Sequence, residues 1–90
     1  MALKLTKNTQ QKLRSLYEEI GFSVRFEKGN FKSGYCLIKD SRVAIINKFL
    51  PLEGRIQSML DILPQIEVDV EQLSDEGEKF YTEIMSAKAE

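Results

Sequence analysis

Residues 22–47 read FSVRFEKGNFKSGYCLIKDSRVAIIN, and this stretch decides the fold. Apolar and polar residues alternate from Phe22 to Glu27, which is the period-two pattern of a half-buried strand. Two further apolar runs follow, each after a short polar segment of the kind that forms tight turns. The pattern predicts a three-stranded antiparallel meander with strands over about 22–27, 31–39 and 42–47.

Two turns fix the register that we expect for this meander. Gly29-Asn30 suits a two-residue hairpin loop, because glycine in the first central position supplies the positive φ of a type II′ turn. Asp40-Ser41 forms the second turn. The expected cross-strand pairs are Val24 with Tyr35, Ile38 with Val43, and Cys36 with Ile45.

This register gives the sheet two apolar faces. One face is expected to carry Phe22, Val24, Phe26, Tyr35, Leu37, Ala44 and Ile46. The other is expected to carry Cys36, Ile38, Val43 and Ile45. At about 25 cal/mol per Å² of apolar area, leaving even the smaller face in water would forgo several kcal/mol, which is comparable with the stability of a small domain. Both faces therefore require cover, from the helices of the chain or from another copy.

Three segments outside the sheet have helical periodicity. The predicted helices cover about 8–20, 51–63 and 75–87. Gly21 suits the left-handed residue that ends the first helix, Pro51 suits the first position of the second, and Ser74 suits the N-cap of the third. Their apolar stripes are Leu13, Leu16, Tyr17 and Ile20; Ile56, Met59, Leu60 and Leu63; and Phe80, Tyr81, Ile84 and Met85. The fold class is therefore α+β, with helices packed on the meander.

Residues 66–73 allow two interpretations. Apolar and acidic residues alternate from Ile66 to Glu71, as in an edge strand guarded by charge. Ile66, Val70 and Leu73 also fit one face of a helix. We favour a short extended segment, which would add an edge strand over 66–71.

Length and composition indicate one domain over residues 1–90. Hydrophobic residues at 42% and charged residues at 30% are ordinary for a globular protein. No window approaches the roughly 18 apolar residues of a membrane span, and the N-terminal run lacks the apolar segment of a signal peptide. The single cysteine excludes an internal disulfide, which fits a reducing compartment. We expect a cytoplasmic protein that does not bind a membrane.

The sequence contains no recognisable catalytic or metal-binding motif. The chain has no histidine, which excludes Ser-His and Cys-His pairs and His-ligated zinc. Cys36 lies in mid-strand, where a cysteine is usually a small packing residue. The acidic residues from Glu67 to Glu78 lack the spacing of a calcium loop, and Gly34 is followed by Tyr35-Cys36 where a phosphate loop has Lys-Ser/Thr. We therefore expect no enzymatic activity, cofactor or metal.

Charge is divided unevenly along the chain. Residues 1–48 carry ten Lys/Arg against four Asp/Glu, whereas residues 49–90 carry three against ten. A basic half with aromatic residues could contact phosphates and stack on bases, so weak nucleic-acid binding is the alternative function. Its candidate contacts are Arg25, Lys28, Lys32, Lys39 and Arg42, with Phe31 and Tyr35 as stacking residues. In a compact domain the opposite charges of the two halves largely cancel, which favours a structural role for them.

Two resemblances bear on the family. The segment KGNFKSGYCLI at 28–38, continuing through Ile45 to Lys48 and Arg55-Ile56, resembles a family of short bacterial proteins of unassigned function. The order of strand, turn, strand ending in Asn47, then a helix, also resembles the amino-terminal part of the ImmA/IrrE-type zinc peptidases. That resemblance implies a scaffold without its peptidase, since residues 59–63 read MLDIL where the family has His-Glu-x-x-His.

The favoured function is a non-catalytic interaction module. The surplus of apolar residues on the second sheet face predicts a homo-oligomer or a complex with another protein, with Cys36, Ile38, Val43 and Ile45 as the contact surface. In a two-fold symmetric dimer the same patch would meet itself. The intramolecular alternative is that the last helix crosses over and buries this face.

Overall fold

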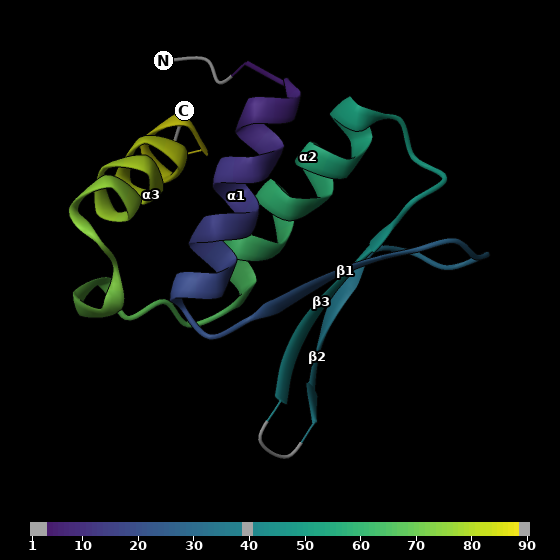
Figure 1. The fold of residues 1–90 in the computed structure, drawn as a ribbon, viewed down its shortest axis with the longest axis horizontal. Coiled ribbons are helices and arrows are strands. Elements are labelled where there is room, and N and C mark those ends of the chain that lie inside the picture. Colours follow the sequence, from purple (N-terminus) through teal and green to yellow (C-terminus); the bar gives the residue numbers. More distant parts are fainter. Residues whose placement is uncertain (1–3, 39–40, 89–90) are drawn as a thin grey trace.

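Helices lie on one side of a three-stranded sheet in the computed structural model, which describes residues 4–38 and 41–88 except the side chains of Ile38 and Lys88 (Figure 1). The elements in chain order are α1 (Lys7–Glu19), β1 (Ser23–Glu27), β2 (Gly34–Ile38), β3 (Ser41–Asn47), α2 (Leu52–Ile62), the 3-10 turns η1 (Leu63–Gln65) and η2 (Val70–Gln72), and α3 (Asp75–Lys88). The α+β class and the three predicted helices are confirmed within the described residues.

The sheet is mixed, so the predicted antiparallel meander is wrong. Its strand order is β1-β3-β2, with β1 parallel and β2 antiparallel to β3. Gly29-Asn30 is therefore not a hairpin turn, and Val24 pairs with Ala44 instead of Tyr35. The six residues 28–33 carry the chain past the end of β3, a distance of two strand spacings or roughly 10 Å that a two-residue loop cannot span.

The central strand β3 carries an uninterrupted apolar run of four residues, which is as long as the run Tyr35–Ile38 of the edge strand β2. Residues 43–46 of β3 are Val-Ala-Ile-Ile, whereas β1 alternates apolar residues with Arg25 and Glu27. A strand with neighbours on both sides is shielded more completely than an edge strand, so the all-apolar run gains most there. The charged residues of β1 remain at the sheet edge, where both are exposed.

The hairpin of β2 and β3 forms, but its register differs from the prediction by two residues. Cys36 pairs with Val43, not Ile45, and Ile38 pairs with Ser41, not Val43. Asp40 of the predicted turn lies outside the described residues. Because side chains alternate with a period of two, a shift of two residues keeps every side chain on its expected face. The residues predicted for each face therefore still lie together on one face, although the predicted register is wrong.

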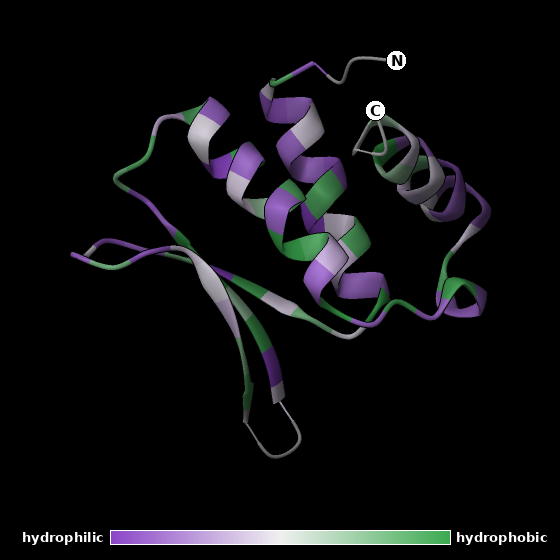
Figure 2. Cartoon of the chain, turned by 180° about the vertical axis from the view of Figure 1, so that it is seen from behind, coloured by the Kyte–Doolittle hydropathy of each residue, from purple (hydrophilic) through white to green (hydrophobic). Residues whose placement is uncertain are grey.

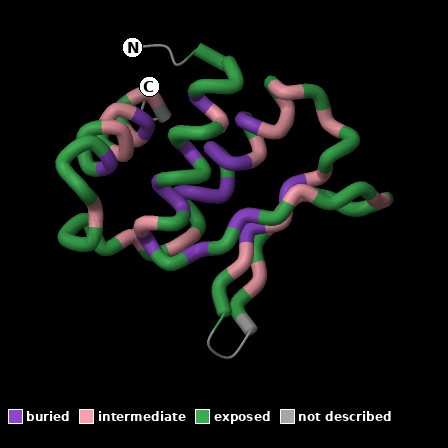
Figure 3. Tube along the Cα trace, in the orientation of Figure 1, coloured by how far each residue is buried: buried purple, intermediate pink, exposed green. Residues whose placement is uncertain are grey.

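The core lies between one sheet face and the two helices α1 and α2 (Figure 3). Val24, Ala44 and Ile46 of the sheet are buried there. Tyr17 of α1 stands edge-on to Phe22, with ring centroids 6.0 Å apart, and its hydroxyl donates to the carbonyl oxygen of Met59 at 2.6 Å. The buried hydroxyl thus has a partner, which removes the cost of burying an unsatisfied polar group.

The first helix ends as its glycine predicts. Gly21 has a φ of 86°, and the backbone N–H of Phe22 donates to the carbonyl oxygen of Tyr17 at 2.9 Å. This turn redirects the chain from α1 into β1 and places Phe22 in the core. At the other end Thr6 caps the helix, with its hydroxyl oxygen accepting from the N–H of Thr9 at 3.3 Å.

No strand forms over 66–71, so that prediction is wrong. The backbone is extended at Ile66 and Asp69 but pairs with no other strand, and Val70–Gln72 form the 3-10 turn η2. The carboxylate of Asp69 accepts from the N–H of Glu71 at 3.1 Å, which favours the turn over an extended continuation. The segment is a connection between α2 and α3.

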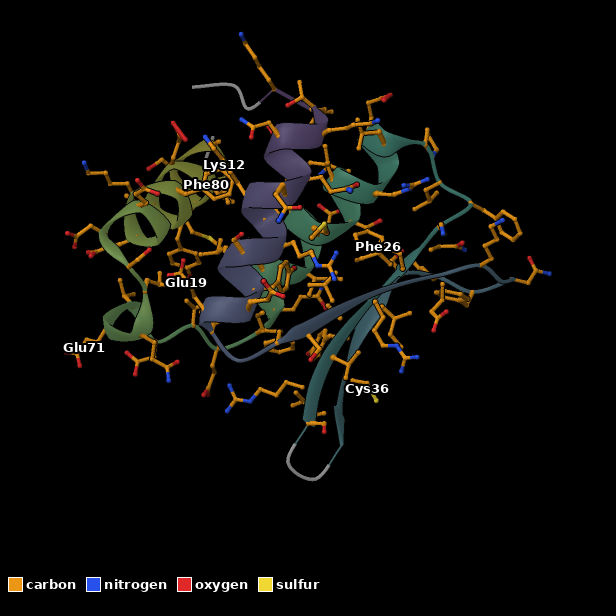
Figure 4. The ribbon with its side chains drawn as sticks, in the orientation of Figure 1. Lys12, Glu19, Phe26, Cys36, Glu71 and Phe80 are labelled. Carbon is orange, nitrogen blue, oxygen red and sulfur yellow. The ribbon has the colours of Figure 1, made fainter. Side chains whose placement is uncertain are left out.

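The last helix packs on α1 and not on the sheet, which excludes the intramolecular cover for the second face. The carboxylate of Glu19 accepts from the backbone N–H of Ser74 at 2.7 Å and from its hydroxyl at 3.1 Å. The Ser74 hydroxyl oxygen accepts in turn from the N–H of Gly77 at 3.0 Å. A Cβ on Gly77 would lie 2.6 Å from Glu19 Oε1, so a larger residue at this position would displace the carboxylate. Lys12 lies over the ring of Phe80 at 5.9 Å on the same interface (Figure 4).

Replacing Glu19 by alanine should lower the free energy of unfolding by about 1–2 kcal/mol, because the start of α3 loses a charged acceptor. Urea denaturation measures the change. Glu18→Ala is the matched control, since Glu18 is exposed on the same helix and should change stability by less than about 0.5 kcal/mol. Equal losses in the two variants would contradict the capping role.

Stability should also fall at alkaline pH through Tyr17. Burial raises the pKa of the Tyr17 phenol well above its ordinary value, and the negative charge of Asp61 raises it further. The folded state therefore holds this proton more tightly than the unfolded state, so its contribution is complete below pH ~10 and is lost as pH rises beyond that. Tyr17→Phe should show a shallower loss of stability above pH ~10 than the wild type in denaturation at a series of pH values, and identical slopes would contradict this.

Candidate interaction surface

The sheet face that points away from α1 and α2 is here named the outer face. It is formed by alternate residues of the three strands: Ser23, Arg25 and Glu27 of β1, Ser41, Val43 and Ile45 of β3, and Gly34, Cys36 and Ile38 of β2. Cys36 points away from the helices, whereas Phe26 points towards them (Figure 4). The described helices therefore cover only one of the two faces.

The predicted contact residues do come together on the outer face. Cys36 lies directly opposite Val43, and Ile45 is the next residue of β3 on the same face. All three side chains are partly exposed. The register places Ile38 on this face too, although its side chain lies outside the described residues. Cys36, Val43 and Ile45, with Ile38 by register, are named the apolar patch.

The β1 side of the outer face is charged. Arg25 lies next to Ile45 in the register and forms an ion pair with Glu27, with Nη2 to Oε1 at 3.2 Å. Both side chains are largely exposed, so the pair contributes at most about 1 kcal/mol to stability. The outer face is thus apolar along β2 and β3 and polar along β1.

Two residues of the opposite face are more exposed than the sequence implied. Leu37 and Tyr35 share the face of the buried Ala44, yet they are 65% and 39% exposed. The tip of the hairpin extends beyond the helices (Figure 1), although α2 contacts β2. The Tyr35 hydroxyl donates to the carbonyl oxygen of Gln65 at 3.4 Å. Apolar side chains therefore lie on both sides of β2, and Figure 2 shows the hydrophobic segments of the hairpin in green.

The candidate nucleic-acid contacts do not share one surface. Arg25 lies on the outer face, whereas Arg42 pairs with Leu37 and lies on the opposite face. Phe31, with Lys28 and Lys32, belongs to the connection between β1 and β2, and Tyr35 lies on the face opposite to Arg25. Lys39 lies outside the described residues. Nucleic-acid binding stays a prediction, and this arrangement gives it no common platform.

Sequence reasoning missed an open cavity of about 650 Å³ between the β1–β2 connection and α2. Asn47 organises its wall. Its Nδ2 donates to the carbonyl oxygens of Gly29 and Phe31 at 3.0 and 2.7 Å, and its Oδ1 accepts from the N–H of Phe49 at 3.0 Å. Because the amide of Asn47 donates to two carbonyl oxygens of the connection and accepts from one N–H, it holds the connection in place. An asparagine at the end of an apolar strand was the one available signal.

The described residues contain no group of three or more His, Cys, Asp or Glu side chains that could hold a metal ion. No described helix is long and apolar enough to cross a membrane. Comparisons with protein-family models, curated proteins and solved structures found no match. Proposals about function therefore rest on the geometry of this chain.

Replacing Asn47 by alanine should lower the free energy of unfolding by about 1–2 kcal/mol, because two loop carbonyls and one N–H lose their partner. Asn30→Ala is the control: Asn30 is exposed in the same connection, and its loss should change stability by less than about 0.5 kcal/mol. Thermal denaturation of both variants makes the comparison. If Asn47→Ala is as stable as Asn30→Ala, Asn47 does not hold the connection.

Proposed function

We propose that this chain is a non-catalytic interaction module that self-associates through the apolar patch of the outer face. The observation that supports the proposal is the one-sided cover of the sheet: α1 and α2 bury one face, α3 packs on α1, and the apolar patch remains partly exposed. Contiguous exposed apolar residues of this kind, bordered by polar ones, are typical of interaction sites.

The chemistry of the outer face favours a second copy as the partner. The apolar patch carries no charge, so it can meet an identical patch across a two-fold axis without placing like charges together. Two sheets that stack in this way lie about 10 Å apart, with the side chains of the two patches interleaved. Arg25 and Glu27 would remain at the rim, where the ion pair stays hydrated.

The size of the patch predicts a weak dimer. Burying a Val or Ile side chain contributes about 1.5–3 kcal/mol, and these side chains are already partly buried. The combined gain from both copies is of order 5–10 kcal/mol, which is comparable with the 4–15 kcal/mol lost in translational and rotational freedom. A dissociation constant of roughly micromolar or weaker follows.

Ile45→Lys tests the proposal, because it places a charge in the centre of the apolar patch. Sedimentation velocity at a series of concentrations should show the wild type associating and Ile45→Lys remaining monomeric. Val70→Lys is the matched control, since Val70 is a 40% exposed aliphatic residue of η2, away from the sheet. If Ile45→Lys associates as the wild type does, the outer face is not the interface.

A further inference from the structure

Strand β2 is an edge strand with a free side. It pairs with β3 alone among the described strands. In an antiparallel pair, alternate residues direct their N–H and C=O groups away from the partner strand. The hydrogen bonds of the described residues give that side of β2 no protein partner. These groups can therefore accept another strand.

The two edges of the sheet differ in the features that prevent such pairing. β1 carries the ion pair of Arg25 and Glu27. β2 reads Gly-Tyr-Cys-Leu-Ile, with no charged residue and no proline. Charges and proline on an edge strand are the usual obstacles to edge-to-edge association. The β1 edge is therefore guarded and the β2 edge is not.

The side chains beside the open edge are exposed and apolar. Leu37 is 65% exposed and Tyr35 is 39% exposed, although they lie on the same sheet face as the core. The tip of the hairpin extends beyond the helices (Figure 1), whereas β2 also contacts α2, and the Tyr35 hydroxyl donates to the carbonyl oxygen of Gln65 in η1. Neither residue belongs to the apolar patch, so stacking of outer faces would leave both exposed.

We infer that a second copy of the chain adds to the β2 edge, antiparallel to the first β2, and forms a continuous six-stranded sheet. With the two-fold axis at Cys36, Tyr35 of each copy lies opposite Leu37 of the other. Such aromatic–aliphatic pairs stabilise neighbouring strands. The axis is perpendicular to the sheet, so both helical layers lie on the same side and the two apolar patches join on the other.

A second copy fits this edge better than a foreign peptide. The edge offers no charged side chain that would select a peptide by its charge. An identical strand supplies the same uncharged edge and the same two exposed side chains, so that each meets an apolar partner. This contact goes beyond the proposed function, because it uses the edge of β2 and the residues Tyr35 and Leu37 instead of the outer face.

Hydrogen exchange of the backbone amides distinguishes the two contacts. In the wild type, amides on the free side of β2 should exchange at least about fivefold more slowly at high than at low protein concentration, whereas the β1 edge should not change. Leu37→Lys should abolish the slowing, because it places a charge on the edge strand. Phe49→Lys is the matched control and should keep the slowing, since Phe49 is 69% exposed but lies in the connection between β3 and α2. Circular dichroism shows that each variant is folded.

Each outcome separates this inference from the proposed function. Slowing that persists in Ile45→Lys and disappears in Leu37→Lys supports edge pairing independently of the outer face. Association by sedimentation without any slowing in β2 overturns edge pairing and leaves outer-face stacking in place. A wild type that is monomeric at all concentrations, with constant exchange in β2, overturns both. Slowing that survives Leu37→Lys also overturns the assigned contact.

Discussion

The insertion of β3 between β1 and β2 is the constraint on which the rest of the structure depends. It gives the all-apolar run Val43–Ile46 neighbours on both sides, and it leaves the charged strand β1 and the uncharged strand β2 at the edges. It also requires a connection long enough to pass the end of β3, and Asn47 holds that connection through hydrogen bonds to its carbonyl oxygens. The length of the connection and the role of Asn47 thus both follow from the position of β3 in the centre of the sheet.

The helices cover only one face of this sheet. The sheet is short and twisted, and α1 and α2 reach just the part that carries Val24, Ala44 and Ile46. Helix α3 could cover the outer face only if it separated from α1. The Glu19 carboxylate, which caps the N-terminus of α3, and the contact of Lys12 with Phe80 hold α3 against α1. The outer face is therefore left partly exposed by the same contacts that position the helices.

The sequence predicts local structure here better than strand order. Helices and sheet faces follow from periodicity, which depends only on neighbouring residues, so α1 and the alternation of Cys36 with Leu37 are recovered. Whether β1 pairs with β2 or β3 is decided by long-range packing, and Gly29-Asn30 favours a hairpin locally while tertiary packing favours the insertion of β3. The same limit applies to the Glu19–Ser74 contact, which joins residues 55 positions apart. The predicted contact residues still share one sheet face by register, because an even shift in register preserves the faces.

Edge strand β1 carries charged residues and edge strand β2 carries none, and the folding of a single copy does not explain this difference. Both edges face solvent, and a charged residue would fit at the position of Leu37, which is 65% exposed, at little cost to the folded chain. The exposed Arg42 lies opposite Leu37 on the same face, and Arg25 and Glu27 lie on the other edge strand, so the fold tolerates charge at exposed positions of this sheet. Apolar residues at an exposed edge raise the risk of unwanted association and contribute little to the core of a lone copy. Their presence on β2, next to the apolar patch, is consistent with a surface whose stability is completed by a partner.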